Sequence, residues 1–231
     1  MQPDLQVGPA AATSGIAAAQ NRVLRNTYAL LGVSMIPTVI GAIIGTNLSF
    51  AFMRASPIIS MLVLLAVVYG LMFAIEKNKD SSLGVYLLLT FTFFMGVILG
   101  PLLQVALAFS NGAQLITVAA GGTGVTFIAM AAFSATTKRD LSGMGRFLFV
   151  GAIVLMIGVV ANIFFQMPAM QLALSAAFIL FSSLVIAYTI NSVVHGGETN
   201  YISATLSIYV SIYNIFTSLL RLLMAVTGNR N

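Results

Sequence analysis

Polar side chains recur along one face of the last hydrophobic segment of the chain, and they are the residues best placed to do chemistry. On a helix, residues three or four positions apart share a face. The polar residues at that spacing are Asn200, Ser203, Ser207, Ser211, Asn214, Ser218 and Arg221. At about 1.5 Å per residue, the stretch from Ser207 to Arg221 covers roughly 21 Å, most of the hydrocarbon depth of a bilayer. Because unsatisfied hydroxyls and amides are costly in lipid, we expect this face to lie against protein or water.

Two interpretations of this polar face stay open. Its hydroxyls could line a water-filled pore, with polar residues of the preceding segment on the opposite wall: Ser175, Ser182, Thr189 and Ser192. Alternatively, small hydroxyl residues let helices approach closely and exchange hydrogen bonds. The candidate residues for the polar face or pore are Thr189, Ser207, Ser211, Asn214 and Ser218. Asn214 is the most informative of them, because an amide at that depth needs several hydrogen-bonding partners.

The segment His195-Gly196-Gly197-Glu198 precedes the last hydrophobic segment and also has two interpretations. Histidine titrates near neutral pH and a carboxylate close by would tune it, so the pair could act as a pH switch. Alternatively, the glycines make a turn and Glu198 or Thr199 caps the following helix, where the positive end of the helix dipole favours an acid. One histidine without further ligands does not make a metal site.

No residue pattern in the chain predicts catalysis. The chain has no Cys, which excludes disulfides and thiolate chemistry. It also lacks the His-Glu-x-x-His sequence of zinc proteases. We therefore predict no catalytic residues, no cofactor and no metal site, and a protein that is not an enzyme. The ten Lys and Arg residues, against five Asp and Glu, are scattered rather than clustered, so nucleic acid is not an expected partner.

The composition is that of an integral membrane protein. Hydrophobic residues make up 59% of the 231 residues and charged residues 6%, outside the usual range of soluble domains. The apolar runs have the length of helices and lack the ten-residue alternation of a transmembrane barrel. We predict an all-α integral membrane fold, a bundle of seven transmembrane helices with the last helix central. The lipid bilayer is therefore an expected partner.

The apolar runs also predict the domain organisation. We expect residues 1–21, which are small and polar, to form a flexible N-terminal tail, and residues 22–231 to form the membrane domain. The predicted spans are about 28–51, 57–75, 83–109, 113–133, 147–165, 169–194 and 201–226. Gly100-Pro101 is expected to interrupt the third span, because proline has no amide hydrogen to donate. Close helix packing is expected at two sets of glycines, Gly41 and Gly45, and Gly121, Gly122 and Gly124.

The basic residues predict the orientation of the chain. Most of the ten Lys and Arg fall on the side of the N-terminus: Arg22, Arg25, Lys77, Lys79, Lys138, Arg139 and Arg146. Arg54, Arg221 and Arg230 fall on the other side. By the positive-inside rule, we expect the N-terminus and its tail in the cytoplasm, and the C-terminus in the periplasm or outside the cell.

Several motifs resemble those of the Bax inhibitor-1 family. One is the glycine-proline motif that begins at Gly96 and includes Gly100-Pro101. The others are residues 23–28 (VLRNTY), 136–142 (TTKRDLS), 160–169 (VANIFFQMPA), 195–202 (HGGETNYI) and 207–216 (SIYVSIYNIF). They resemble the bacterial YccA branch of the family in particular, and the resemblance extends over almost the whole chain after the tail.

The resemblance implies a seven-helix bundle with the last helix central. For the YccA branch it also implies a multi-pass protein of the bacterial inner membrane whose partner is the FtsH protease complex. Such a protein binds and negatively modulates FtsH, a membrane-anchored AAA protease, and so affects the turnover of membrane proteins. A protease of this kind must grip a loose end, and the tail is the candidate for it.

The alternative function is a pH-sensitive calcium or proton leak channel, with a small cation as the partner. Other members of the family leak calcium under the control of two aspartates that face each other from the sixth and seventh helices. The matching positions in this chain are Thr189 and Ser211. Hydroxyls neither bind a hard dication strongly nor titrate near neutral pH, so the resemblance does not extend to a leak gated by carboxylate protonation.

Overall fold

The computed structural model describes residues 9–51, 55–137 and 139–228, and the secondary structure within them is helical. The helices are α1 (Pro9–Thr46), α3 (Pro57–Lys77), α4 (Ser82–Ile98), α5 (Gly100–Leu107), α6 (Gly112–Thr136), α7 (Met144–Phe165), α8 (Pro168–Val194) and α9 (Tyr201–Gly228). A helix satisfies its own backbone hydrogen bonds, which is the first requirement for a chain that crosses lipid.

Seven of the described helical segments are long and apolar enough to span a membrane. They are Ala18–Thr46, Ile58–Lys77, Ser82–Leu107, Gly112–Thr136, Met144–Phe165, Pro168–Val194 and Tyr201–Gly228. The all-helical fold with seven spans is therefore confirmed. Large side chains such as Phe73, Phe149 and Phe164 are exposed on the outside of the bundle, as expected of a surface that faces acyl chains.

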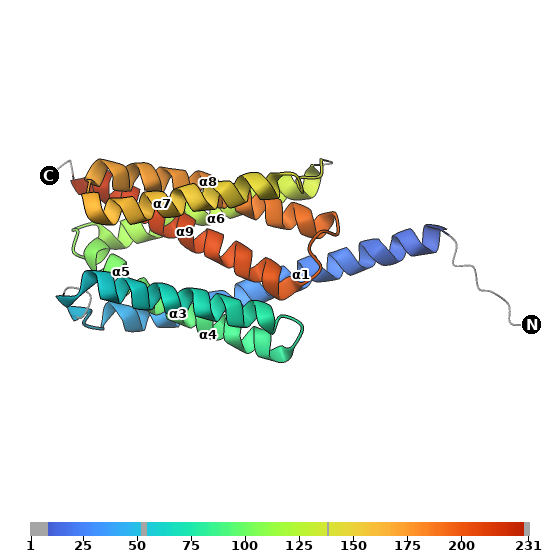
Figure 1. The fold of residues 1–231 in the computed structure, drawn as a ribbon, viewed down its shortest axis with the longest axis horizontal. Coiled ribbons are helices and arrows are strands. Elements are labelled where there is room, and N and C mark those ends of the chain that lie inside the picture. Colours follow the sequence, from blue (N-terminus) through green and yellow to red (C-terminus); the bar gives the residue numbers. More distant parts are fainter. Residues whose placement is uncertain (1–8, 52–54, 138, 229–231) are drawn as a thin grey trace, which may run out of the picture.

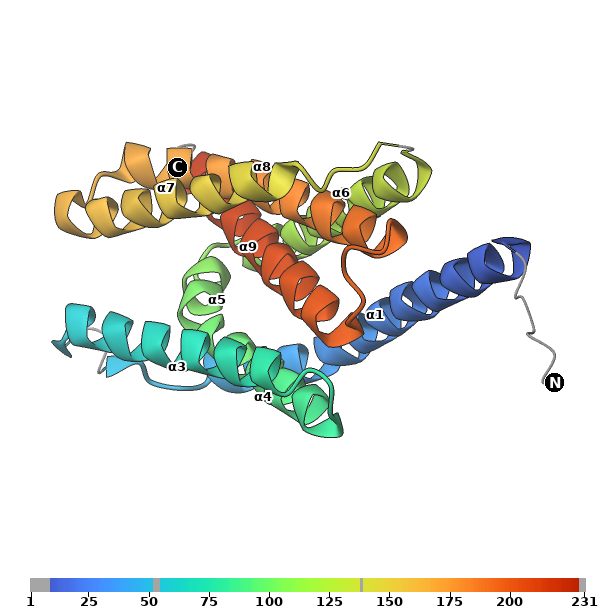
Figure 2. The ribbon, with the colours of Figure 1, turned by 45° about the vertical axis from the view of Figure 1, so that its right-hand side comes forward.

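Helix α9 runs between two groups of helices (Figures 1 and 2). One group contains α1, α3 and α4, the other contains α6, α7 and α8, and Figure 2 shows α9 crossing obliquely between them. Among the described residues, α9 contacts α1, α3, α4, α5, α6 and α8, whereas α7 packs on α8. Side chains of α9 therefore contribute to the packing of both groups.

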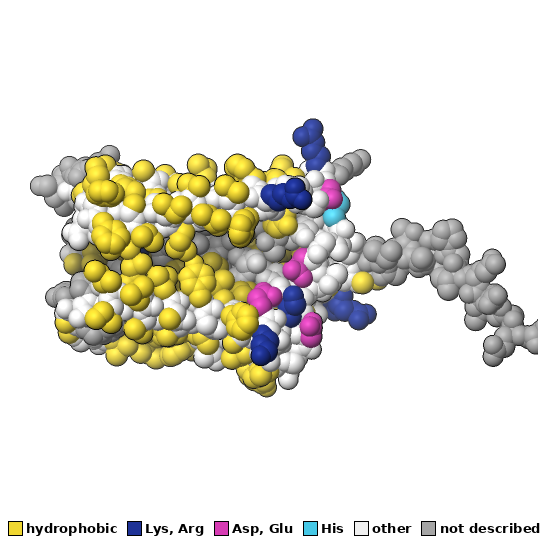
Figure 3. Space-filling model, viewed as in Figure 1, with side chains coloured by type: hydrophobic (Ala, Val, Ile, Leu, Met, Phe, Trp, Pro, Cys, Tyr) yellow, Lys and Arg dark blue, Asp and Glu magenta, His cyan; other side chains and the backbone are white. Residues whose placement is uncertain are grey.

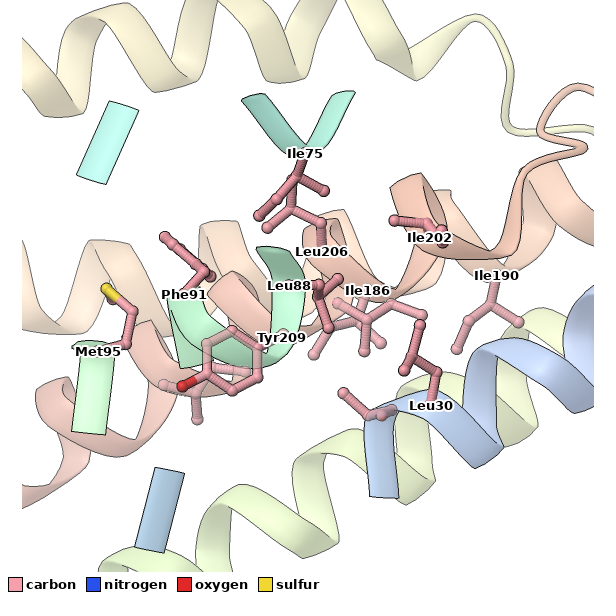
Figure 4. Packing of buried hydrophobic residues seen from close by; sticks show 13 residues of the cluster. Leu30, Ile75, Leu88, Phe91, Met95, Ile186, Ile190, Ile202, Leu206 and Tyr209 are labelled. Carbon is pink, nitrogen blue, oxygen red and sulfur yellow. The ribbon is translucent and has the colours of Figure 1, made fainter. Parts of the chain in front are cut away.

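Two clusters of buried apolar side chains hold α9 in this position. The larger cluster joins α1, α3, α4, α8 and α9 (Figure 4), and its labelled members are Leu30, Ile75, Leu88, Phe91, Met95, Ile186, Ile190, Ile202, Leu206 and Tyr209. The smaller cluster lies toward the C-terminal end of α9 and contains Leu99, Leu103, Ala106, Leu115, Ala119 and Leu220. Helix α9 is thus anchored by apolar contacts near both of its ends.

Helices α1 and α4 approach each other closely because glycines lie at their contact. A Cβ atom on Gly41 would collide with the backbone carbonyl of Phe93, and one on Gly96 would collide with the backbone of α1. One turn further along, a Cβ atom on Gly100 would collide with the backbone carbonyl of Gly45. The close packing expected at Gly41 and Gly45 is therefore confirmed.

The glycines of α6 differ from the prediction of close packing. A Cβ atom on Gly121 or Gly124 would meet nothing within 4 Å, and one on Gly122 would meet only the side chain of Leu219, at 3.2 Å. The physical reason is that this face of α6 points away from the other helices, since the side chain of the neighbouring Val125 is 69% exposed. The prediction is wrong for Gly121 and Gly124.

The third span consists of two helices rather than one bent helix. Helices α4 and α5 meet at Leu99, directly before Gly100 and Pro101. Pro101 has no N–H to donate to the carbonyl four residues earlier, which weakens the helix at this point. Figure 2 shows α5 turned away from the direction of α4. On α5, the side-chain amide of Gln104 donates to the carbonyl of Thr46 at 3.0 Å. This hydrogen bond connects the short helix α5 to the C-terminal end of α1.

Helix α1 begins at Pro9, well before the predicted start of the first span at residue 28. Residues 1–8 lie outside the described residues, but residues 9–21 of the predicted flexible tail are helical. This segment is rich in alanine, which has the highest helix propensity, and proline is well accepted in a first turn. Figure 1 shows this part of α1 extending beyond the other helices.

Charged side chains gather at the end of the bundle from which α1 projects (Figure 3). This end contains the α3–α4 turn, the α6–α7 loop and the α8–α9 loop. The described Lys and Arg residues in or beside these elements are Arg22, Arg25, Lys77, Lys79, Arg139 and Arg146. Arg221 lies near the opposite end of α9, while Arg54, Lys138 and Arg230 fall outside the described residues. Which end faces the cytoplasm stays a prediction of the positive-inside rule.

Candidate functional site

The predicted polar face of α9 divides into a buried part and an exposed part. Ser211 and Ser218 are 3% and 4% exposed, and Thr189 on α8 is 7% exposed. Asn214 is half-buried and Ser207 is exposed. The hydroxyl of Ser211 donates to the carbonyl of Ser207 at 2.8 Å. The Ser211 hydroxyl is therefore satisfied within its own helix and needs no partner from a neighbour.

Part of this face opens into a pocket of about 250 Å³ between the α4–α5 junction, α7, α8 and α9. The polar lining comes from one helix, α9, and consists of Tyr213, Asn214, Thr217, Ser218 and Arg221. The apolar lining consists of Ile98, Leu99, Leu102, Val159 and Phe178. We name this the α9 pocket.

Most polar side chains of the α9 pocket have no partner within the described part of the protein. The hydroxyl of Thr217 donates to the carbonyl of Tyr213 at 3.0 Å. By contrast, the side chains of Tyr213, Asn214, Ser218 and Arg221 make no hydrogen bond or ion pair with another described residue. Each of these four side chains carries a hydrogen-bond donor, and Arg221 adds a full positive charge. No Asp or Glu lines the pocket, so its chemistry suits an anion or water and disfavours a cation.

The segment from His195 to Glu198 forms a tight turn between α8 and α9. Gly196 has a φ of 80°, which glycine adopts without strain. Nδ1 of His195 lies 3.0 Å from the carbonyl oxygen of Asn191, and Oε1 of Glu198 accepts a hydrogen bond from the N–H of Asn200 at 2.7 Å. Within the described chain no hydrogen bond or ion pair joins His195 to Glu198. Each side chain therefore stabilises its own end of the turn.

Asn200, rather than the two residues before it, caps α9. Its Oδ1 accepts a hydrogen bond from the N–H of Ile202 at 2.9 Å, the geometry of an N-cap. Its Nδ2 donates to the carbonyl of Lys79 at 3.0 Å and to the carboxylate of Asp80 at 2.8 Å. The start of α9 is thereby fastened to the α3–α4 turn.

Glu76 adds a second link between α3 and α9. Helix α3 continues to Lys77, so Glu76 lies in its last turn and inside the apolar segment, although the predicted second span ends at about residue 75. Its Oε2 accepts a hydrogen bond from the hydroxyl of Ser203 at 2.9 Å and lies 3.5 Å from Nζ of Lys79. This carboxylate is positioned by α9 rather than free in solvent.

Asn191 is a fully buried polar residue that the sequence patterns did not single out. Its Oδ1 accepts a hydrogen bond from the N–H of Leu141 at 2.8 Å, and its Nδ2 donates to the carbonyl of Arg139 at 3.0 Å. It fixes the α6–α7 loop to the end of α8. The sequence feature that could have identified Asn191 is a single amide side chain in the last turn of a predicted span, where an unsatisfied polar group would be costly.

Asp140 orders the same loop. Its carboxylate accepts one hydrogen bond from the N–H of Ser142 at 2.8 Å and one from the Ser142 hydroxyl at 3.0 Å. These two bonds, the backbone bond first, lower the pKa of Asp140 from its ordinary value, and the nearby charge of His195 adds to them. The carboxylate of Asp140 therefore stabilises the α6–α7 loop through Ser142.

No group of three His, Asp or Glu side chains lies close enough to hold a metal ion in the ranges described. Thr189 and Ser211, which the resemblance predicts to match the aspartate pair, are both buried, and no hydrogen bond between their hydroxyls is found in this part of the chain. The pair therefore offers neither charge nor a shared proton.

The family of the chain follows from a comparison with family models. A model described as "Inhibitor of apoptosis-promoting Bax1" matches residues 20–228, nearly the whole membrane-spanning part. The chain belongs to the Bax inhibitor-1 family. The glycine-proline motif of this Bax inhibitor-1 chain lies at the α1–α4 contact, through Gly96 and Gly100, and at the α4–α5 break, through Pro101.

Relatives of this Bax inhibitor-1 protein cover most of its length. An uncharacterized protein of Neisseria meningitidis serogroup A is 47% identical over 211 residues, which is 90% of this chain and 93% of the relative. The Escherichia coli K12 protein named "Modulator of FtsH protease YccA" is 45% identical over 203 residues, 88% of this chain and 90% of the relative. The equally similar protein of Escherichia coli O6:H1 is named "Inner membrane protein YccA". Together with the seven apolar helices, these relatives support a multi-pass protein of the inner membrane.

Proposed function

We propose that this protein binds the FtsH protease and lowers its activity toward other membrane proteins. The observation that carries the proposal is the 45% identity, over 88% of the chain, to the Escherichia coli protein named as a modulator of FtsH. The protein acts as a slow or competing substrate, which occupies the protease through one end and resists extraction through its packed helices.

The N-terminal part of α1 is the proposed handle for the protease. A membrane-anchored AAA protease pulls on an end that it can grip, and α1 extends past the bundle at this end (Figure 1). An alanine-rich helix outside the bundle is only marginally stable by itself, so it unfolds at low cost. Arg22 and Arg25 follow this segment, and the positive-inside rule puts it in the cytoplasm.

Resistance to extraction comes from the contacts of α1 with α4 and α9. Gly41 and Gly96 bring the α1 and α4 backbones together, so α1 cannot slide along α4 without steric clashes. The hydroxyl oxygen of Thr38 lies 2.9 Å from that of Tyr209 on α9. A pull on the N-terminal end is therefore applied to one of the most tightly packed helices, which prolongs the occupation of the protease.

Affinity capture of the full chain from native membranes tests the binding step, and FtsH is the expected co-purifying protein. Deletion of residues 2–17 stops before Arg22 and Arg25 and before the described apolar segment Ala18–Thr46, and should leave the bundle intact. We expect this deletion to lengthen the half-life of the protein in cells that contain FtsH. An unchanged half-life would show that the protease does not grip the N-terminal part of α1. The absence of FtsH from the captured material would show that the protein does not bind FtsH.

A cation leak along the polar face of α9 is the weaker candidate. Arg221 lines the α9 pocket without an acidic partner there, and Thr189 and Ser211 carry no charge. Calcium flux into liposomes that contain the purified protein, at two pH values, separates the two functions. A flux that a bulky residue at Ser211 abolishes would favour transport over modulation of the protease.

A further inference from the structure

The α9 pocket combines unpaired hydrogen-bond donors with an apolar wall inside the membrane-spanning part of the protein. We propose that it binds one anionic phospholipid from the leaflet at the C-terminal end of α9, with the phosphate at Arg221 and an acyl chain against Leu102, Val159 and Phe178. This inference does not depend on the proposed modulation of FtsH, because it rests on the pocket alone.

The polar side of the pocket fits an anionic group with several oxygen atoms. The guanidinium of Arg221 and the side chains of Tyr213, Asn214 and Ser218 make no hydrogen bond or ion pair with another described residue, and they share one pocket. A guanidinium pairs with phosphate through two parallel hydrogen bonds. Donors left unsatisfied within a membrane are costly, so a ligand that accepts hydrogen bonds is stabilised at this position.

The spacing of the polar groups along α9 matches the order of groups in a phospholipid. Arg221 lies seven residues, or about 10 Å, before the end of α9 at Gly228, which corresponds to the depth of the headgroups. Ser218 and Asn214 follow about one and two turns deeper. Ser218 lies where the ester carbonyls just below a phosphate would accept a hydrogen bond, whereas Asn214 lies deeper, beside the start of the acyl chains.

The other side of the pocket favours a lipid over a soluble anion. Ile98, Leu99, Leu102, Val159 and Phe178 are all apolar and come from helices on three sides. They belong to membrane-spanning segments, so acyl chains can reach the pocket from the bilayer. An inorganic phosphate would leave this apolar surface in contact with water, whereas a phospholipid covers it with a chain.

The chain has no Trp, so one introduced Trp reports on the pocket without background. Phe178→Trp places the probe in the pocket wall, and Phe164→Trp places a control probe on a side chain that is 74% exposed toward lipid on α7. The proteins are reconstituted in phosphatidylcholine with increasing mole fractions of brominated phosphatidylglycerol, which quenches Trp fluorescence on contact. We expect half-maximal quenching of Phe178→Trp at a mole fraction of brominated lipid about tenfold lower than for Phe164→Trp. A tenfold difference corresponds to the free energy of one charge-assisted hydrogen bond.

Further arms of the experiment identify the ligand. Arg221→Gln in the Phe178→Trp background should abolish the tenfold preference, whereas Arg146→Gln, at the charged end, should retain it. Brominated phosphatidylcholine should give no preference. Equal quenching of the two probes, a preference that survives Arg221→Gln, or displacement of the brominated lipid by inorganic phosphate would each overturn the proposal. The comparison of brominated phosphatidylglycerol with brominated phosphatidylcholine uses only the Phe178→Trp protein. It therefore tests the preference for an anionic lipid even if Arg221→Gln does not fold.

Discussion

The hydroxyl oxygens of Thr38 and Tyr209 lie 2.9 Å apart and join the first membrane-spanning helix to the last. The Tyr209 hydroxyl also donates to the carbonyl of Thr92 on α4 at 3.2 Å, and its ring packs edge-on against Phe91. One buried phenol thus connects α1, α4 and α9. Because α1 carries the end that projects from the bundle, this contact bears directly on how the protein resists extraction.

Tyr209→Phe removes this hydroxyl and keeps the ring. We expect it to lower the free energy of unfolding by about 1 kcal/mol, the worth of a hydrogen bond between membrane helices. Thermal unfolding in detergent measures the change, with Tyr69→Phe on the exposed side of α3 as the control. Thr38→Val should add little to Tyr209→Phe, because both changes remove the same contact. Full additivity of the two changes would contradict this account.

Two glycines of α1 provide a matched pair for the α1–α4 contact. Gly41→Ala places a methyl group against the carbonyl of Phe93, whereas Gly32→Ala meets nothing within 4 Å. We expect Gly41→Ala to destabilise the protein by about 1–3 kcal/mol through overpacking. Gly32→Ala should be neutral or stabilising, because alanine is the better helix former. Equal unfolding temperatures for the two variants would mean that α1 and α4 are not in close contact.

Asn191 is expected to hold the α6–α7 loop in place. Asn191→Ala leaves the N–H of Leu141 and the carbonyl of Arg139 without their partner, and should cost about 1–3 kcal/mol. Hydrogen exchange at Leu141 should accelerate in this variant. Asn47→Ala serves as the control, because the Asn47 side chain bonds only within residues 43–46 at the end of α1. Unchanged exchange at Leu141 would show that the loop is ordered by other contacts.

The hydrogen bonds of Asp140 predict how the loop responds to acid. Its folded-state pKa is lowered below the ordinary 3.8, so its stabilising effect is complete above the unfolded pKa of about 4 and is lost as the pH falls through the lower folded value. Hydrogen exchange at Ser142, corrected for the intrinsic rate, should be equally slow at about pH 7 and pH 5. Asp140→Ala should accelerate exchange at both pH values. Protection that persists in this variant would contradict the role of the carboxylate.

Composition and apolar run lengths were enough to predict the seven spans, because a helix that crosses lipid must be long, apolar and nearly free of charge. The Gly41 and Gly45 contact was also predictable from spacing. The outward direction of Gly121 and Gly124 was not, since small residues at helical spacing do not say whether a partner helix is present. The helix over residues 9–21 was missed because their low hydrophobicity was weighed above the helix propensity of alanine.

The candidate site was predictable only in part. Helical periodicity placed Asn214, Ser218 and Arg221 on one face, but the pocket in which they lie depends on walls from α5, α7 and α8. Long-range packing of this kind has no local sequence pattern. The same holds for Asn191, whose partners lie about fifty residues away in the chain, and for the Thr38–Tyr209 contact across 171 residues.

The central claim, that the protein restrains FtsH by occupying it, is tested most directly by degradation in a reconstituted membrane. Purified FtsH is placed in liposomes with a second membrane-protein substrate, and the degradation rate of that substrate is followed with and without this protein. We expect slower degradation in the presence of the full chain, and recovery of the rate with the variant that lacks residues 2–17. Equal degradation rates with and without the full chain would show that this protein does not restrain FtsH.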